Sequence, residues 1–167
     1  MVNIKTEKEI QTMKEGGKIL ADILNKLSEA VKPGITTNDL EKLACELVSS
    51  YKVKSSFLGF DGYPAVLCTS INDEIVHAVP SDRVLKEGDL LKIDMGVLHK
   101  DFHTDSAITV LVGQKDKVIH TTPLNGVSPQ VLISVTKEAL NIGISKAKVG
   151  NTLGDIGSAI QKHIEDK

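Results

Sequence analysis

The sequence lacks most features of a secreted, membrane-bound or nucleic-acid-binding protein. Its two cysteines, Cys45 and Cys68, are widely spaced in apolar surroundings. They fit reduced, buried thiols better than a disulfide framework or a zinc site. No apolar run is long enough to span a membrane, and the polar N-terminus lacks the apolar core of a signal peptide. The net charge of -2 offers no basic surface for nucleic acid. We therefore expect a cytoplasmic protein with no membrane or nucleic-acid partner.

Aromatic residues are also scarce, at 3% of the chain, with three phenylalanines, two tyrosines and no tryptophan. Three of these five rings nevertheless fall between Phe57 and Tyr63. Aromatic side chains are most often part of a protein core, and that interpretation applies here. The alternative is a pocket wall, since glycine and proline residues punctuate this stretch.

The 167 residues, 41% hydrophobic and 25% charged, suit one domain with its own core. The chain opens with the pattern of a long amphipathic helix. Thr6 and Glu9 form a capping-box sequence, and apolar residues recur at helical spacing as far as Val31. Gly16 and Gly17 interrupt this helix, which suggests that another element approaches closely at that point.

The other predicted elements alternate between helical and β-favouring patterns. They are a helix from Asn38, capped by Glu41, to about Tyr51; strands at 65–70 and 74–79; a linker at 114–128; and helices at 131–146 and 153–164.

Residues 90–112 are predicted to form a β-hairpin that carries two aspartates. If residues 98–101 form a four-residue loop, Val97 faces Phe102 and Asp94 lies directly opposite Asp105. A register slip of one residue would instead place the two carboxylates on opposite faces. The loop contains no Asn-Gly pair, so its sequence does not by itself fix the register.

Two carboxylates that face each other across a hairpin repel, and this repulsion destabilises the sheet. The compensating group could be a shared proton, a nearby cation such as a lysine, or a metal ion that takes oxygen ligands from both. We favour the metal ion.

The chain also contains a short internal repeat. Residues 32–40 and 148–156 share four identical positions in nine, and in both segments one helix ends at a glycine and another follows. A common helix-loop-helix connection would explain this much. The larger hypothesis is a helix-helix-sheet unit at 1–113, a linker at 114–128, and the opening helices of a second unit at 129–167.

Four motifs together resemble the type I methionine aminopeptidases, and the resemblance extends over essentially the whole chain. They are GYP at 62–64, SINDEIVHAVP at 70–80, KEGDLLKIDMGV at 86–97 and FHTDSA at 102–107. The resemblance implies the α/β (α+β) pita-bread fold, in which two similar halves surround a dinuclear metal site. This chain would supply about one half and the first helices of the other.

The resemblance also implies roles for individual residues. Asp94 would bind one metal ion and Asp105 would bridge two, the ions being cobalt, manganese, iron or zinc. His77 would contact the scissile amide and help stabilise the tetrahedral intermediate. A monovalent cation is a further cofactor in this family, at the turn that contains Asn72.

The methionine side chain would lie in a pocket lined by Tyr63, Phe57 and Phe60. Phe60 stands where many family members have tyrosine, and Phe57 where many have cysteine, so the shape of the pocket differs. The substrates implied are nascent proteins and peptides that begin with methionine.

The family's remaining ligands are a histidine in a glycine-flanked motif and two glutamates, and this sequence stops before them. His163 does not replace that histidine, because no glycine flanks it. Two other functions stay open: a catalytically incomplete half that acts as a binding module, and a proline-specific peptidase of the same fold. We also expect the inner face of the half-fold to be apolar and to promote self-association.

Overall fold

The computed structural model describes residues 3–113 and 127–167. Its contacts divide the chain into two compact units, 1–118 and 119–167, which are treated separately below. Nearly all of the linker predicted at 114–128 lies outside the described residues.

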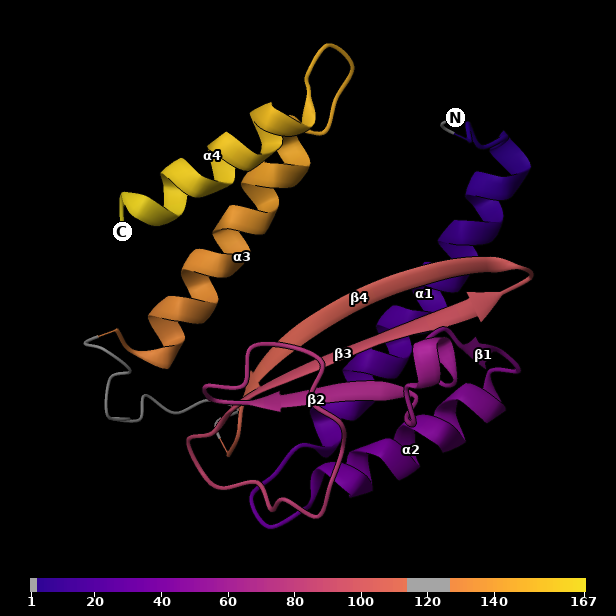
Figure 1. Cartoon of the computed structure of the whole chain (residues 1–167), viewed down its shortest axis with the longest axis vertical. Helices are drawn as coiled ribbons and strands as arrows, with labels where there is room; N and C mark the ends of the chain where they lie inside the picture. The colour runs from indigo at the N-terminus through magenta and orange to yellow at the C-terminus, as the bar shows by residue number, and fades with distance from the viewer. Residues whose placement is uncertain (1–2, 114–126) are drawn as a thin grey trace. The chain divides into compact units, whose positions relative to one another are not determined.

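The first unit is an antiparallel sheet with two helices against one face (Figure 1). Strand β3 is central, with β4 on one side and with β2 and β1 along its other side. The elements in chain order are α1 (Glu7–Ala30), α2 (Thr37–Ser50), β1 (Lys54–Ser55), the 3-10 turn η1 (Phe60–Gly62), β2 (Leu67–Ile71), β3 (Leu90–His99) and β4 (Phe102–Leu111).

Helix α1 begins as its sequence predicts. Thr6 and Glu9 form both bonds of the capping box, in which each side chain accepts from the other residue's backbone N–H. Gly16 lies where the sheet comes closest, because a Cβ atom there would lie 3.3 Å from the Cβ of His99. A Cβ atom at Gly17 would meet nothing within 4 Å, so the close approach concerns only the first glycine.

Helix α2 begins two residues earlier than predicted. Its N-cap is Thr36 and its capping partner is Asp39, rather than Asn38 and Glu41. Several residues here can cap a helix, and tertiary contacts decide among them. Glu41 instead accepts hydrogen bonds from the backbone of β2 and the residue before it, at 2.8 Å from Val66 N.

The core lies between the sheet and the helices. Alternate residues of β3 are completely buried, and they pack in one cluster with apolar residues of α1 and α2. The buried β3 residues are Leu91, Ile93, Met95 and Val97. The residues between them face the other side of the sheet, which is where Asp94 lies.

The strand predicted at 65–70 is confirmed as β2, but the strand predicted at 74–79 is wrong. That segment is an irregular loop between β2 and β3. Its backbone bonds go partly to side chains, because Ala78 N donates to the Ser70 hydroxyl while Ala78 O accepts from Thr69 N. Asn72 and His77 both have positive φ angles, +56° and +60°, which an extended strand does not allow.

The second unit is a pair of helices, α3 (Pro129–Lys146) and α4 (Leu153–Glu165). They pack closely at Gly143, where an added Cβ atom would lie 2.8 Å from Ile160 Cδ1. His163 of α4 lies 3.2 Å from the carboxylate of Glu138 on α3.

The repeated segments have the same local structure. Gly34 and Gly150 both have φ of +93°, and the capping box of Thr36 and Asp39 in α2 recurs as Thr152 and Asp155 in α4. The repeated glycines therefore lie in the turn between two helices, and the repeated Thr and Asp start the second helix. The first helix of each pair ends before the glycine rather than at it, with C-caps at Val31 and Ala147.

Two expectations from composition can be checked directly. Cys68 is buried, but Cys45 is exposed on α2, so the prediction of two buried thiols is wrong for Cys45. Cys45 is exposed because the buried face of α2 contains its neighbour Ala44, and Cys45 lies off that face. Among the residues described, no helix is both long and apolar enough to cross a membrane.

Candidate metal and peptide site

The hairpin of β3 and β4 brings the two aspartates to one face, in a register that differs from the prediction. Asp105 pairs with Gly96, and Asp94 pairs with Ala107. The connection is a two-residue turn, Lys100-Asp101, rather than a four-residue loop. The prediction of directly opposed aspartates is therefore wrong by two residues. Asp94 and Asp105 are instead diagonal neighbours across the hairpin. A shift of two preserves the face, because side chains alternate with period two.

The connecting turn is shorter than expected because both of its residues adopt positive φ angles, +48° at Lys100 and +67° at Asp101. This is the conformation that two-residue hairpin turns require, and Asn-Gly is only its commonest sequence.

Asp105 lies close enough to Asp94 to affect the ionisation of Asp94. Burial and the neighbouring carboxyl of Asp105 raise the pKa of Asp94, while His77 acts in the opposite direction. Diagonal neighbours on one sheet face remain within reach of each other's side chains. The protein thus holds two acidic groups together at a cost to the ionised form of Asp94.

A pocket of about 550 Å³ opens in front of the two aspartates. It lies within the first unit, between the sheet and the segment around η1. The pocket is lined by Phe57, Phe60, Asp61, Gly62, Tyr63, Pro64, Cys68, His77, Asp94 and Asp105. All the site residues predicted from the sequence therefore border one cavity.

His77 reaches this pocket from the loop that follows β2. Its φ angle of +60° is unusual for a residue with a Cβ atom. The chain continues directly into Ala78, which is held to β2 by Thr69 and Ser70. A strained residue beside a firmly anchored one is common where side-chain direction matters for function.

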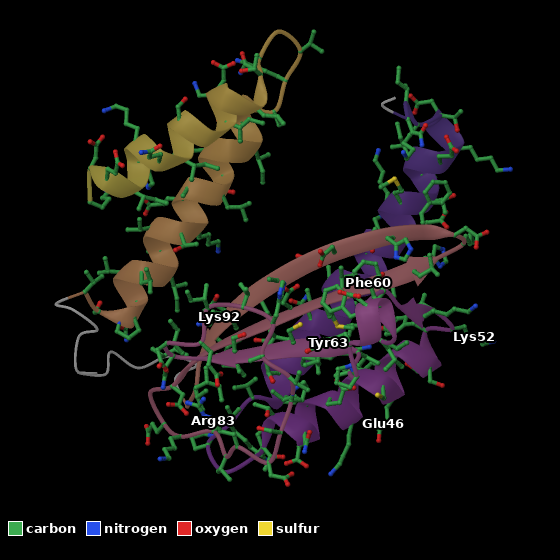
Figure 2. The ribbon with its side chains drawn as sticks, in the orientation of Figure 1. Glu46, Lys52, Phe60, Tyr63, Arg83 and Lys92 are labelled. Carbon is green, nitrogen blue, oxygen red and sulfur yellow. The ribbon has the colours of Figure 1, made fainter. Side chains whose placement is uncertain are left out.

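Tyr63 and the two phenylalanines form the aromatic side of the pocket. The Tyr63 hydroxyl lies 3.1 Å from Leu67 O and 3.4 Å from Ala78 O, so it links η1 to both β2 and the His77 loop. Burial raises the pKa of this hydroxyl, which keeps it protonated as a donor. Phe57 is half-buried. Phe60, which is labelled near Tyr63 in Figure 2, is 76% exposed.

Sequence reasoning missed Asp61 and Cys68, which line the pocket, and Gly96, which lies against Phe57. Cys68 lines the pocket because β2 pairs it directly with Asp94. Gly96 makes room for Phe57, since a Cβ atom at Gly96 would lie 3.1 Å from Phe57 Cε1 and 3.0 Å from Thr104 O. The alternation of β2 could have identified Cys68, but nothing local marked Gly96.

The donor set fits a divalent metal ion in part. Two adjacent carboxylates offer hard oxygen ligands, and a bound cation would offset their repulsion. Lys92, the lysine nearest to them along β3, does not serve this purpose, because its ammonium binds the carbonyls of Asn72 and Glu74. Within the described ranges, no histidine, cysteine or further acidic residue joins the two aspartates as a third member of a metal-binding cluster.

The strand face around the aspartates carries both polar and apolar side chains, so the expectation of an apolar inner face holds only in part for β3 and β4. It carries Lys92, Asp94, His103, Asp105 and Thr109 together with Leu90, Leu98, Ala107 and Leu111, whereas the fully buried apolar residues of β3 pack with the helices. Exposed apolar side chains of the first unit lie instead in its loops, at Leu58, Phe60, Ile75, Val76, Val79 and Val84. Self-association stays a prediction.

Comparison with known proteins gives consistent relationships. The model of the family described as Metallopeptidase family M24 matches residues 11–167. The chain is 40% identical to a methionine aminopeptidase of Clostridium acetobutylicum over 99% of its own length and 62% of that protein. It is 35% identical to methionine aminopeptidase 1 of Bacillus subtilis, covering 100% of this chain and 63% of the relative. The chain thus spans less than two thirds of these curated relatives.

Solved structures agree. The methionine aminopeptidase of Rickettsia prowazekii superposes with a TM-score of 0.90 at 35% identity, over 99% of this chain and 63% of that one. The prolidase of Pyrococcus furiosus gives a TM-score of 0.78 at 21% identity, over 98% of this chain and 44% of that one, which shows the shared fold alone. The fold is therefore the α/β pita-bread fold.

The family model covers both the aspartate hairpin and the His77 loop, and it extends through both helices of the second unit. With the paired acidic side chains in one pocket, these matches show that the chain belongs to metallopeptidase family M24.

Proposed function

We propose that this chain provides part of the active site of a metal-dependent aminopeptidase that removes the N-terminal methionine from nascent proteins and peptides in the cytoplasm. The observation that carries the proposal is the pocket in which Asp94, Asp105 and His77 meet an aromatic wall. The methionine aminopeptidases to which the chain is 35–40% identical in sequence support the choice of substrate.

Asp94 and Asp105 would hold the metal ions, two in the complete site, with cobalt, manganese, iron and zinc as candidates. When bound, such ions supply Lewis acidity that activates water and polarises a carbonyl group. The raised pKa of Asp94 fits this role, because a cation would favour the ionised form that burial and Asp105 disfavour.

His77 would donate a hydrogen bond to the substrate amide at the bond to be cleaved. His77 lines the pocket and its loop is anchored at Ala78, so the loop would hold the imidazole toward a bound peptide. A general base is still needed to take the proton from water. Among the described residues, no third His, Cys, Asp or Glu joins the pair in a group that could hold a metal ion.

The aromatic wall would select the side chain. Phe57 and Tyr63 present apolar ring faces, and the Tyr63 hydroxyl is already directed to backbone carbonyls. A pocket of this kind favours an unbranched thioether over a charged side chain, because a charge would lose its hydration there. The fold shared with prolidases gives no support for proline specificity at 21% identity.

A peptide titration tests this function. Met-Ala-Ser and Lys-Ala-Ser are added to the full chain with excess manganese, and binding is followed by the NMR signals of Tyr63 and Phe57 while released amino acid is measured by mass spectrometry. We expect the methionyl peptide to bind at least about tenfold more tightly, which corresponds to about 1.4 kcal/mol. Free methionine should be the released product.

Asp105→Asn should abolish release, whereas Asp101→Asn, in the exposed turn of the same hairpin, should not. Asparagine tolerates the positive φ angle of that position, so it is a matched control. Equal binding of both peptides would contradict methionine specificity. Binding with no release of methionine, even at long incubation, would support a binding module instead.

A further inference from the structure

The ammonium group of Lys92 binds two backbone carbonyls of the loop that leads to His77. Lys92 Nζ lies 2.8 Å from Asn72 O, and it also donates to Glu74 O. Lys92 shares the sheet face of Asp94, two residues away on β3, yet it does not line the pocket. Its charge is therefore directed at the loop rather than at the site of reaction.

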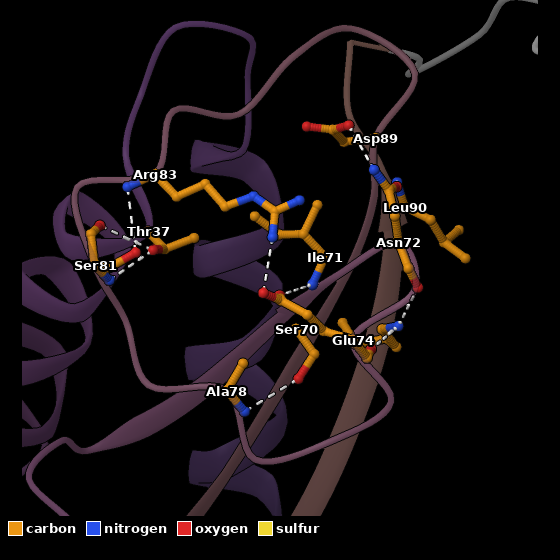
Figure 3. Close-up of polar contacts among 11 residues, drawn as sticks. Thr37, Ser70, Ile71, Asn72, Glu74, Ala78, Ser81, Arg83, Asp89 and Leu90 are labelled. Carbon is orange, nitrogen blue, oxygen red and sulfur yellow. Dashed lines mark hydrogen bonds and ion pairs between the residues drawn. The ribbon is translucent and has the colours of Figure 1, made fainter.

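The first of these carbonyls belongs to a sharply turned residue. Asn72 has a φ angle of +56°, and its side chain accepts from Leu90 N at 2.8 Å and donates to Asp89 at 2.9 Å (Figure 3). The turn is thus fixed to the start of β3. Its carbonyl then points toward the ammonium, two residues farther along the same strand.

The second carbonyl belongs to Glu74, which is also held by its side chain. The carboxylate accepts from Ile71 N at 2.7 Å and forms an ion pair with Arg83 at 2.7 Å (Figure 3). Three residues later comes His77, and the next anchor after it is Ala78 on Ser70. Between Glu74 and Ala78 the side chains of Ile75 and Val76 are exposed, at 81% and 61%, and give little apolar anchorage.

We propose that Lys92 is a positioning residue that acts as a built-in cation, gathering the Asn72 and Glu74 carbonyls so that the following segment presents His77 to the pocket. The proposal deepens the function above and rests on it only for the role of His77. Two carbonyl dipoles that converge repel each other, and a charged donor offsets this more strongly than a neutral one.

This role differs from the two other uses of a lysine beside an acidic pair. Lys92 does not neutralise Asp94 and Asp105, because its donors are engaged with the loop. It does not deliver protons to the substrate, because it is absent from the pocket wall. Since the chain itself supplies the positive charge, the loop needs no external monovalent cation at the Asn72 carbonyl.

The direct test is made on the wild-type, metal-free chain. NMR scalar couplings across hydrogen bonds should connect the Lys92 ammonium nitrogen with the carbonyl carbons of Asn72 and Glu74. The His77 ring signals should be unchanged when sodium is replaced by potassium or ammonium. Absence of couplings to both carbonyls would overturn the proposal without any variant being made.

Variants then test the link to His77. Lys92→Met keeps an unbranched side chain, one atom shorter, and removes the charge. The amide hydrogen exchange of Glu74 and Ala78 should therefore accelerate about tenfold or more, the loss expected for a charged hydrogen bond. The His77 ring signals should shift or broaden. Lys54→Met, which removes an exposed lysine of β1 in the same sheet, should change neither.

Chemical rescue separates positioning from general stability. In Lys92→Ala, methylammonium should restore the His77 signals toward their wild-type positions, whereas tetramethylammonium, which cannot donate hydrogen bonds, should not. Wild-type exchange and His77 signals in Lys92→Met would overturn the proposal, as would equal recovery with both cations. None of these readouts requires peptidase activity, so failure of the proposed function would leave them intact.

Discussion

At the scale of single residues, Asp94 combines two properties that oppose each other in a folded protein. It is partly buried, and it lies beside a second carboxyl group, so both its surroundings and Asp105 raise its pKa. Natural proteins retain such arrangements mainly at functional sites. The stability of the metal-free chain should therefore improve when this charge is removed.

Asp94→Asn is expected to raise the free energy of unfolding at pH 7 by a few tenths to about 1 kcal/mol, the scale of cross-strand pair effects. The folded-state pKa lies above the ordinary value of 3.8, so the folded state binds the proton more tightly. Wild-type stability should thus fall as pH rises from about 3.8 through the raised pKa, and the variant should lose this part of the decline. Urea unfolding from pH 3.5 to 8 measures both.

Asp101→Asn serves as the control, because Asp101 is exposed in the hairpin turn. Its stability should stay within about 0.5 kcal/mol of wild type. A loss of stability in Asp94→Asn at pH 7 would show that the carboxylate is well compensated in the metal-free chain.

The sequence allowed the aspartates to be placed on one face but not in the correct register. The alternation of Leu91, Ile93 and Met95 determines the face, because the buried side must be apolar. The register depends on the turn, and Lys100-Asp101 adopts positive φ angles without the usual Asn-Gly signal. The resemblance correctly placed His77 at the pocket, but the strand predicted at 74–79 was wrong, because side chains distant in sequence hold this loop.

At the scale of helices and strands, capping residues determine where a helix begins, and a glycine without a side chain allows a helix to lie close to the sheet. The first capping box was predicted correctly because Thr6 and Glu9 are the only candidate capping pair near the start of α1. In α2, Thr36 and Asp39 compete with Asn38 and Glu41, and Glu41 is needed elsewhere by the backbone of Val66. Local sequence does not reveal that demand, because it arises from the packing of β2 against α2.

Gly16 and Gly17 of α1 provide a matched pair at this scale. Gly17→Ala should stabilise the chain by about 0.5–1 kcal/mol, since alanine is the better helix former and its Cβ atom would meet nothing within 4 Å. Gly16→Ala should lack this gain or lose stability, because its Cβ atom would press on His99 and Thr104 of the hairpin. Thermal unfolding followed by circular dichroism compares them.

Equal stabilisation by both substitutions would mean that the hairpin does not contact α1 at Gly16. The outcome matters for the site, since His99 and Thr104 belong to the strands that carry the two aspartates.

At the scale of the whole chain, the pocket, the hairpin and the His77 loop are present, but the described acidic ligands are two. Catalytic metal sites need more protein ligands and a supporting outer layer of hydrogen bonds. The chain alone is therefore expected to bind metal weakly and to hydrolyse methionyl peptides slowly. Assay with excess cobalt or manganese would test this, and turnover of about 1 per second or more would contradict it.

The most direct test of the account is the location of a bound divalent ion. Manganese is titrated into the isotopically labelled chain, and paramagnetic broadening is mapped by residue. We predict that signals around Asp94 and Asp105 broaden first, that Asp105→Asn abolishes this selectivity, and that Asp101→Asn retains it. Broadening centred elsewhere, or unchanged broadening at Asp94 in Asp105→Asn, would contradict the claim that these two carboxylates form one metal site.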